Sequence, residues 1–222
     1  METRTEDGLV KRERRKQARP GELLDAALAL FVEKGFAATR VEEVAARAGV
    51  SKGTLFLYFE SKEELLKAVV HENLAGRFVQ WNEEFERFVG TSAEMLRACL
   101  AAWWERIGST PASGITKLMI SESQNFPELA TYYQREVIEP GKALIRRILQ
   151  RGVDRGEFRV ADMDYAIYSV IAPMIFLMMN KHSMGICVPP GQHLDPLRFV
   201  AMQAEVLLQG LCVRDAKDGA AS

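Results

Sequence analysis

Hydrophobic residues recur every three or four positions along most of the chain, which is the spacing of one face of an α-helix. Leu24, Ala27 and Phe31 show this spacing in the first such segment. Pro20 near the start of the segment and Gly35 after its end are typical of helix termini. No segment alternates hydrophobic and polar residues over a sustained stretch, so the pattern predicts an all-α protein.

The same spacing, read together with capping residues, predicts about nine helices. Residues 108–114 and 184–192 are rich in proline and glycine and should be loops. Pro140 should kink or split the helix that contains it, because proline cannot donate the backbone hydrogen bond. The expected helices cover residues 20–34, 40–48, 51–59, 62–88, 92–107, 115–123, 127–152, 162–182 and 196–211.

The lengths of the apolar stretches argue against membrane insertion or secretion. The longest uncharged one, residues 165–180, has 16 residues with Pro173 in its middle, whereas a spanning helix needs about 20. The N-terminal basic run lacks the apolar segment of a secretory signal behind it. Three scattered cysteines do not form a disulfide framework. We therefore expect a cytoplasmic protein.

Positive charge is concentrated near the N-terminus, although the net charge of the whole chain is only −1. Residues 11–62 contain 11 Lys or Arg against 7 Asp or Glu, and the remainder contains 18 against 23. A basic end on an acidic body favours a polyanionic partner, although a solvated tail has the same composition. The densest basic cluster comprises Lys11, Arg12, Arg14, Arg15, Lys16 and Arg19.

Two short helices joined only by Gly49-Val50 are typical of a helix-turn-helix. In the second of them Ser51 is placed to cap the helix, and Leu55 and Phe59 would face the core. Exposing the apolar side chains at the outward positions to water is unfavourable unless a partner covers them. The outward residues suit contacts with the phosphates and base edges of DNA. Those positions are Ser51, Lys52, Gly53, Thr54, Phe56, Leu57 and Tyr58. The alternative places Phe56 and Tyr58 in the core.

The stretch AGVSKGTLFLYFESKEEL, residues 48–65, resembles the TetR/AcrR family of bacterial transcription regulators. Among the positions at which the family pattern AGVSxGxLYxYFxxKExL specifies a residue, this stretch differs at one, where Phe56 replaces the usual Tyr. The upstream residues Gly35-Phe36 and the segment 38–45, ATRVEEVA, are also similar, and the close resemblance covers about residues 20–68. The resemblance implies DNA contacts from Ser51, Lys52, Thr54, Phe56, Tyr58 and Lys62.

The first residues of the second helix depart from what relatives often carry. Arg40 follows Thr39 where many relatives have a hydroxyl residue, and Glu42 stands where many have a basic one. Thr39 and Arg40 are expected at the edge of the DNA surface, with Arg40 contacting phosphate. Glu42 would repel phosphate or accept from a cytosine amino group. The basic arm before Pro20 is expected to touch phosphates or the minor groove.

The resemblance divides the chain into a DNA-binding domain, residues 1–62, and a helical ligand-binding and dimerisation domain, residues 63–222. Residues 165–179 and 199–211 are apolar nearly all round, so each should be buried on several sides. In the family the last two long helices pair between protomers, and a dimer reads two half-sites of a palindromic operator. The alternative is a monomer core.

The middle helices are expected to enclose a small apolar or amphipathic effector. Bulky, flexible or aromatic side chains line such pockets, although each of these residues could equally belong to an ordinary core. Glu105 and Glu122 could face a cationic ligand, or be solvated. The candidate pocket residues are Trp103, Trp104, Met119, Phe126, Tyr132, Tyr133, Tyr168 and Met174.

No enzyme motif is found. The three histidines, His71, His182 and His193, have neither His nor Cys partners at metal-ligand spacing, and no cofactor is expected. Two alternatives to the DNA-binding regulator are considered. One is a thiol enzyme with Cys99 as nucleophile, and the other is a sensor with a vestigial DNA-binding part and Cys187 as its thiol.

Overall fold

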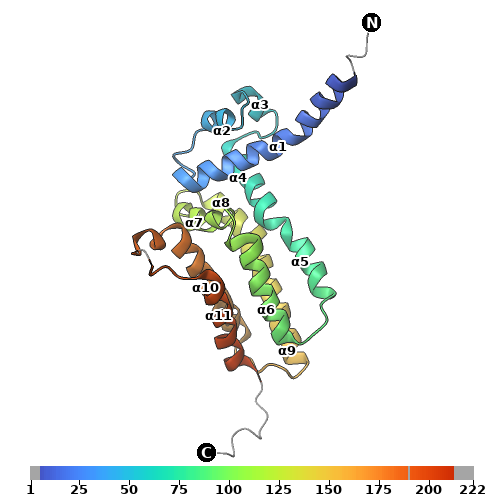
Figure 1. Ribbon diagram of the computed structural model, residues 1–222, viewed down its shortest axis with the longest axis vertical. Coiled ribbons are helices and arrows are strands. Elements are labelled where there is room, and N and C mark those ends of the chain that lie inside the picture. The colour runs from blue at the N-terminus through green and yellow to red at the C-terminus, as the bar shows by residue number, and fades with distance from the viewer. Residues whose placement is uncertain (1–5, 190, 213–222) are drawn as a thin grey trace, which may run out of the picture.

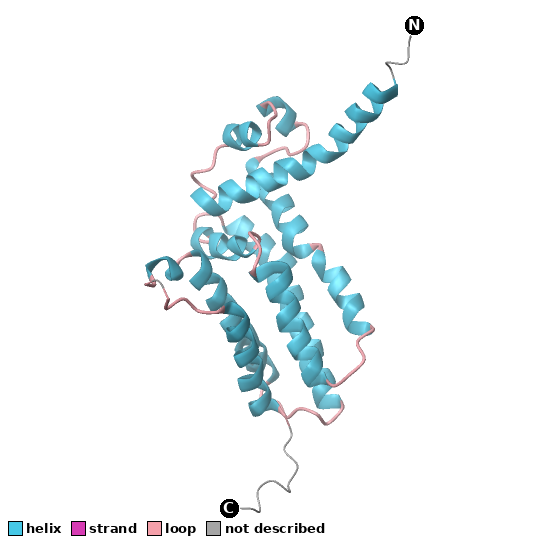
Figure 2. Cartoon of the chain, in the orientation of Figure 1, coloured by secondary structure: helices cyan, strands magenta, loops and turns pink. Residues whose placement is uncertain are grey.

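A computed structural model describes residues 6–189 and 191–212, and in this part of the chain it contains helices and no strand (Figure 2). The α-helices are α1 (Glu6–Lys34), α2 (Val41–Arg47), α3 (Lys52–Phe56), α4 (Lys62–Val70), α5 (Arg77–Glu86), α6 (Ser92–Trp103), α7 (Ser113–Glu122), α8 (Pro127–Tyr133), α9 (Glu139–Asp154), α10 (Met163–His182) and α11 (Pro196–Leu211).

Three wider π turns interrupt these helices: η1 (His71–Ala75), η2 (Trp104–Gly108) and η3 (Gln134–Ile138). If each is counted with its neighbours, and the short 3-10 turn η4 (Met184–Cys187) is set aside, the described residues form nine helices. The all-α prediction is therefore confirmed. The helix is not split at Pro140: α8, η3 and α9 follow one another without a break, and the π turn η3 lies just before this proline.

The start of α1 differs from the prediction. The helix was expected to begin near Pro20, but it continues back to Glu6, with Pro20 inside it. Proline removes one hydrogen bond there, while the lysine, arginine and glutamate residues that precede it are good helix formers. The N-terminal end of α1 therefore projects away from the rest of the molecule as a helical extension (Figure 1).

The N-terminal helices share one core with α4. Leu23 and Phe31 of α1, Leu55 of α3 and Leu65 of α4 are all fully buried. Ser61 caps α4 by accepting the backbone N–H of Glu64 at 3.1 Å, as the sequence predicts. Because α4 packs on α1 and leads into α5, it connects the N-terminal helices to the remaining ones.

The helices from α5 onward form a second, longer bundle, which we call the C-terminal part. The helices α10 and α11 run side by side along one edge of it (Figure 1). Among the described residues, α10 is long and apolar enough by composition to cross a bilayer, a test that interior helices of soluble proteins also pass. Only 22% of its most apolar window is buried within one chain.

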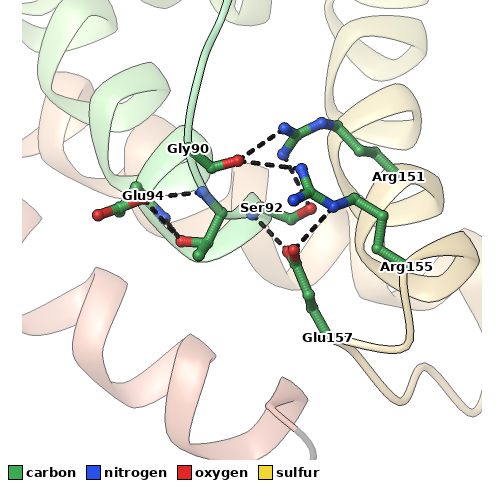
Figure 3. A network of polar contacts seen from close by, with 7 residues as sticks. Gly90, Ser92, Glu94, Arg151, Arg155 and Glu157 are labelled. Carbon is green, nitrogen blue, oxygen red and sulfur yellow. Dashed lines mark hydrogen bonds and ion pairs between the residues drawn. The ribbon is translucent and has the colours of Figure 1, made fainter.

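A polar network ties the beginning of α6 to the end of α9 (Figure 3). Arg151 donates to the Gly90 carbonyl at 2.8 Å and to Ser92 Oγ at 3.0 Å. Arg155 donates to the same carbonyl at 3.0 Å and pairs with Glu157 at 2.9 Å. Glu157 also accepts the Ser92 backbone N–H. The network fixes α6 and α9 to each other at the end of the molecule far from α3.

Candidate functional site

The turn between α2 and α3 presents the start of α3 on the surface. Gly49 has a φ of 68°, a left-handed conformation that favours glycine, and it lets the chain turn within two residues. Ser51 then caps α3: its Oγ accepts the backbone N–H of Thr54 at 3.1 Å and lies 2.9 Å from the Thr54 hydroxyl. Leu55 is fully buried beneath and anchors α3, which packs on α2, in the core of the N-terminal helices.

Around this anchor, the residues that the sequence assigned to the outward side of α3 are exposed, except Thr54, which is half-buried. Phe56 is 41% exposed, Leu57 83% and Tyr58 37%, and Lys52 is exposed as well. This placement argues against Phe56 and Tyr58 as core residues. Exposed aromatic and aliphatic side chains beside a lysine form a surface that a DNA groove can cover.

Lys52 is already paired on this surface. Its ammonium lies 2.6 Å from the Glu42 carboxylate of α2 and 5.7 Å from the centre of the Phe56 ring. The hydrogen bond from Lys52 holds the pKa of Glu42 below its ordinary value. A phosphate that binds Lys52 would therefore have to displace a carboxylate, and Glu42 would oppose such binding both by occupying Lys52 and by repelling phosphate.

Replacing Glu42 with Gln is expected to tighten DNA binding a few-fold at low salt, since the substitution frees Lys52 and removes a negative charge from the surface. Titrations of a DNA duplex at several salt concentrations measure this effect. The matched control is Glu83→Gln, an exposed carboxylate paired with Arg87 on α5, which should bind DNA as the wild type does. Unchanged or weaker binding by the Glu42 variant would contradict the competition.

Lys62 and Thr39 do not face the DNA surface, contrary to expectation. The Lys62 ammonium donates to the carbonyls of Phe36 at 2.8 Å, Thr39 at 3.1 Å and Ala37 at 3.4 Å. An ammonium has three donors, so none is left for phosphate. Thr39 is 2% exposed, and its hydroxyl donates to the carbonyls of Gly35 at 2.7 Å and Leu30 at 3.2 Å. Both residues stabilise the turn between α1 and α2.

Arg40 lies at the start of α2. It is the N-cap residue, and its side chain is exposed. Glu43 pairs with it in a capping arrangement, in which the Arg40 backbone N–H donates to the Glu43 carboxylate at 3.3 Å. Arg40 therefore remains a candidate for phosphate contact, while Thr39 does not.

A carboxylate from the C-terminal part holds the other side of the same turn. Glu122, at the end of α7, accepts the backbone N–H groups of Phe36 at 3.1 Å and Ala37 at 3.2 Å. The buried Phe36 ring packs edge-on against Phe126, with 4.7 Å between ring centres. The α1–α2 turn is thus held by Lys62 through its carbonyls and by Glu122 through its amides. Neither a cationic ligand nor simple solvation explains Glu122.

A cavity of about 410 Å³ lies within the C-terminal part; we call it the main cavity. Four of the candidate pocket residues line it: Trp103, Tyr133, Tyr168 and Met174. Tyr133 is buried, its hydroxyl lies 2.9 Å from that of Thr116, and burial raises its pKa to about 12. The walls are otherwise mostly apolar, and the cavity falls in the size range of small-molecule sites.

The other four candidate pocket residues lie elsewhere. Trp104 packs beside Trp103, at 6.0 Å between ring centres, but lines a different surface depression. Met119 is buried in the core. Phe126 packs on Phe36, and the Tyr132 hydroxyl donates to the Lys67 carbonyl at 3.3 Å. These side chains join helices to each other and do not line the main cavity.

Sequence reasoning missed several residues of the main cavity, among them Phe78, Trp81, Thr116 and Lys142. Lys142 is the only lysine or arginine among the residues lining the main cavity, and its ammonium lies 5.5 Å from the centre of the Tyr168 ring. A signal was available in the sequence: Lys142 follows Pro140-Gly141, where a kink or split of the helix was expected.

The cysteines give no support to a thiol enzyme. Cys99 is buried, and the lack of solvation raises the pKa of its thiol to about 12, so little thiolate forms at neutral pH. Cys187 is exposed in η4. Among the described residues, no group of three or more His, Cys, Asp or Glu side chains is placed to hold a metal ion.

The outer face of α10 and α11 is apolar and open to solvent. Phe176 and Phe199 lie 5.8 Å apart between ring centres and join the two helices. Beyond this contact the two helices expose further large hydrophobic side chains, as interaction sites do: Tyr165, Leu197, Met202, Val206 and Tyr168, of which Tyr168 also lines the main cavity.

Comparison with known proteins places the chain among bacterial regulators. Residues 23–69 match the family described as bacterial regulatory proteins, tetR family, and residues 89–184 match the tetracyclin repressor-like C-terminal domain. The chain is 30% identical to the HTH-type transcriptional repressor KstR2 of Mycobacterium tuberculosis over 151 residues. This aligned region covers 66% of this chain and 72% of KstR2.

Solved structures share the fold. The fatty acid degradation regulator FadR from Bacillus halodurans superimposes with a TM-score of 0.70 at 24% identity, covering 86% of this chain and 94% of that one. FadR from Bacillus subtilis in complex with stearoyl-CoA gives 0.63 at 22% identity, covering 85% and 97%. With its helix-turn-helix and its C-terminal part both matched, the chain belongs to the TetR family of bacterial transcriptional regulators, whose members are DNA-binding proteins and not enzymes.

Proposed function

We propose that this regulator acts in the cytoplasm as a homodimeric repressor that binds a palindromic operator and leaves it when an apolar or amphipathic ligand fills the main cavity. In this proposal, residues 1–62 bind DNA, and residues 63–222 form the dimer and bind the ligand. The observation that carries the proposal is the set of exposed side chains around α3, held outward by the buried Leu55.

The residues proposed to contact DNA surround the start of α3 and α2. Lys52 and Arg40 would bind phosphates, while Thr54 and the exposed ring of Tyr58 would reach the groove. Gly53 adds no side chain and permits close approach of the backbone. The proposed set is Arg40, Ser51, Lys52, Gly53, Thr54, Phe56, Leu57 and Tyr58. The basic extension of α1 before Pro20 would add further phosphate contacts.

Dimerisation through α10 and α11 would cover their exposed apolar face. Alone, α10 leaves most of its most apolar window unburied, and exposing so much apolar surface is unfavourable in water. A second copy covers the same patch on both protomers in a two-fold arrangement, and it supplies the second α3 that a palindromic operator requires.

The main cavity suits a hydrocarbon chain with a polar head. Its walls are mostly apolar, and Lys142, whose ammonium pairs with Glu139 at 3.3 Å, would exchange that partner for the anionic group of a ligand. A structural relative was solved with stearoyl-CoA. We therefore propose long-chain acyl-CoA thioesters as the ligand class and stearoyl-CoA as the first probe.

Helix α7 connects this cavity to the DNA-binding domain. Thr116 and Ile120 of α7 line the main cavity, and Glu122 one half-turn later holds the amides of the α1–α2 turn. A ligand that moves α7 therefore acts on the turn from which α2 and α3 are oriented. A helix that contacts both sites is an element through which an allosteric change would act.

The Lys52→Ala variant tests the DNA surface. Removing one phosphate contact should weaken binding to every sequence and lower the slope of log affinity against log salt by about one per protomer. The measurement is a salt titration on the DNA that flanks the protein's own gene. Lys117→Ala, on α7 in the C-terminal part, is the matched control and should keep the wild-type slope. A wild-type slope for Lys52→Ala would remove this lysine from the interface.

A further inference from the structure

A second, smaller cavity of about 200 Å³ lies next to the main cavity. It is formed mainly by α5 and α6, whose positions are seen in Figure 1. Its walls are apolar except where Glu84 and Arg106 line it. The Arg106 guanidinium donates to both oxygens of the Glu84 carboxylate, at 3.0 and 2.7 Å, so these two charges satisfy each other. We call this space the second cavity.

Three side chains line both cavities: Trp81 of α5, Cys99 of α6 and Leu144 of α9. They therefore form the partition between the two spaces. Trp81 is 7% exposed, and its ring packs edge-on against Phe78, with 5.6 Å between ring centres. Phe78 in turn lines the main cavity. A hydrocarbon chain passing these residues would exchange one set of apolar contacts for another, at little cost.

We propose that the second cavity is the site for the far end of a long, unbranched acyl chain whose body fills the main cavity and whose polar head lies at Lys142. This inference rests on the proposed ligand class. At about 200 Å³ the second cavity is larger than the roughly 150 Å³ that holds a molecule such as benzene, so it has room for the end of a chain, which would lie beside the exposed Glu84 and Ala98.

The partition also discriminates between ligand shapes. A single hydrocarbon chain is narrow and flexible, so it can pass between three side chains that shift by small amounts. A rigid fused-ring compound is wider and would remain in the main cavity. The polar network at the ends of α6 and α9 (Figure 3) fixes two of the three walls to each other, which restricts how far the partition can widen. The second cavity therefore selects for chains and for their length.

Two alanines of α6 keep the second cavity empty. Ala98 and Ala102 both line it, and residues four apart lie on the same face of a helix. Ala98 is exposed and Ala102 half-buried, while Ala101, the neighbour of Ala102, is exposed and does not line the second cavity. This pair of adjacent alanines offers a matched test, because Ala102→Phe fills the second cavity and Ala101→Phe adds the same side chain outside it.

The experiment measures the affinities of decanoyl-, myristoyl- and stearoyl-CoA for the full-length wild type, Ala102→Phe and Ala101→Phe by titration calorimetry. Each methylene buried adds up to about fourfold in affinity. The wild type and Ala101→Phe should bind stearoyl-CoA tightest. Ala102→Phe should bind stearoyl-CoA roughly 10- to 100-fold more weakly, while its affinity for decanoyl-CoA stays within about twofold of the wild type.

Operator binding without ligand verifies that each variant is folded, and Ala102→Leu replaces Ala102→Phe if the latter fails that check.

The outcomes separate this inference from the proposed ligand class. If all three thioesters bind and Ala102→Phe keeps the wild-type dependence on chain length, or weakens all three equally, the second cavity is not the chain-end site. If the wild type binds none of the three, the acyl-CoA class is wrong, and the chain-end site is wrong with it, while the DNA-binding proposal is unaffected.

Discussion

Val206→Arg is expected to convert the dimer into a monomer and to weaken operator binding at least about 100-fold. Val206 is 61% exposed in α11, among the large hydrophobic side chains that α10 and α11 expose. In a two-fold interface the same position occurs on both protomers, so the substitution introduces two like charges into an apolar contact. The loss follows because two linked half-site contacts become one.

Sedimentation and operator titration at matched protein concentration measure the two effects. The control is Val89→Arg, which makes the same change at a residue that is 95% exposed in the loop between α5 and α6. It should remain a dimer with wild-type operator affinity. A Val206→Arg protein that stays dimeric and binds the operator normally would place the dimer interface elsewhere.

The helices and the outward side of α3 could be predicted because their signals are local. The spacing of Leu55 and Phe59, and the caps at Ser51 and Ser61, fix helix ends and buried faces from a few neighbouring residues. The structure confirms these caps and the burial of Leu55. The exposed state of Phe56 and Tyr58 followed from the same periodicity.

The roles of Lys62 and Thr39 could not be predicted because they depend on contacts between elements. Lys62 begins α4, yet its ammonium reaches carbonyls 23 to 26 residues earlier in the chain. A lysine near a DNA-binding helix looks the same in sequence whether it binds phosphate or carbonyl oxygens. Glu122 is a stronger example, since its partners lie 85 and 86 residues away.

Half of the candidate pocket residues were placed wrongly for a related reason. Bulky aromatic side chains serve equally well in a cavity wall and between two helices. Trp103 and Trp104 are adjacent and both buried, but only Trp103 lines the main cavity. Which neighbour faces the cavity depends on the rotation of α6 and on the π turn η2 that follows it, and a π turn has no clear sequence signal.

The contacts at the α1–α2 turn make Glu122 the most informative residue for the coupling between ligand and DNA. A carboxylate that accepts two backbone N–H groups makes charge-assisted hydrogen bonds, which are stronger than neutral ones. In the Glu122→Ala variant these amides lose their partner from α7, whereas Lys62 still holds the carbonyls of the same turn. The DNA-binding domain should therefore stay folded but respond less to the position of α7.

We expect Glu122→Ala to bind stearoyl-CoA like the wild type but to lose most of the ligand's effect on operator affinity. Allosteric coupling typically changes affinity about 5- to 150-fold, and in this variant the ratio of operator affinities without and with ligand should fall toward one. Linkage demands the reciprocal result, so bound operator should no longer weaken stearoyl-CoA binding. Glu128→Ala, an exposed carboxylate in the first turn of α8, is the control and should keep the wild-type ratio. If Glu122→Ala keeps it too, the signal travels through α4 instead of α7.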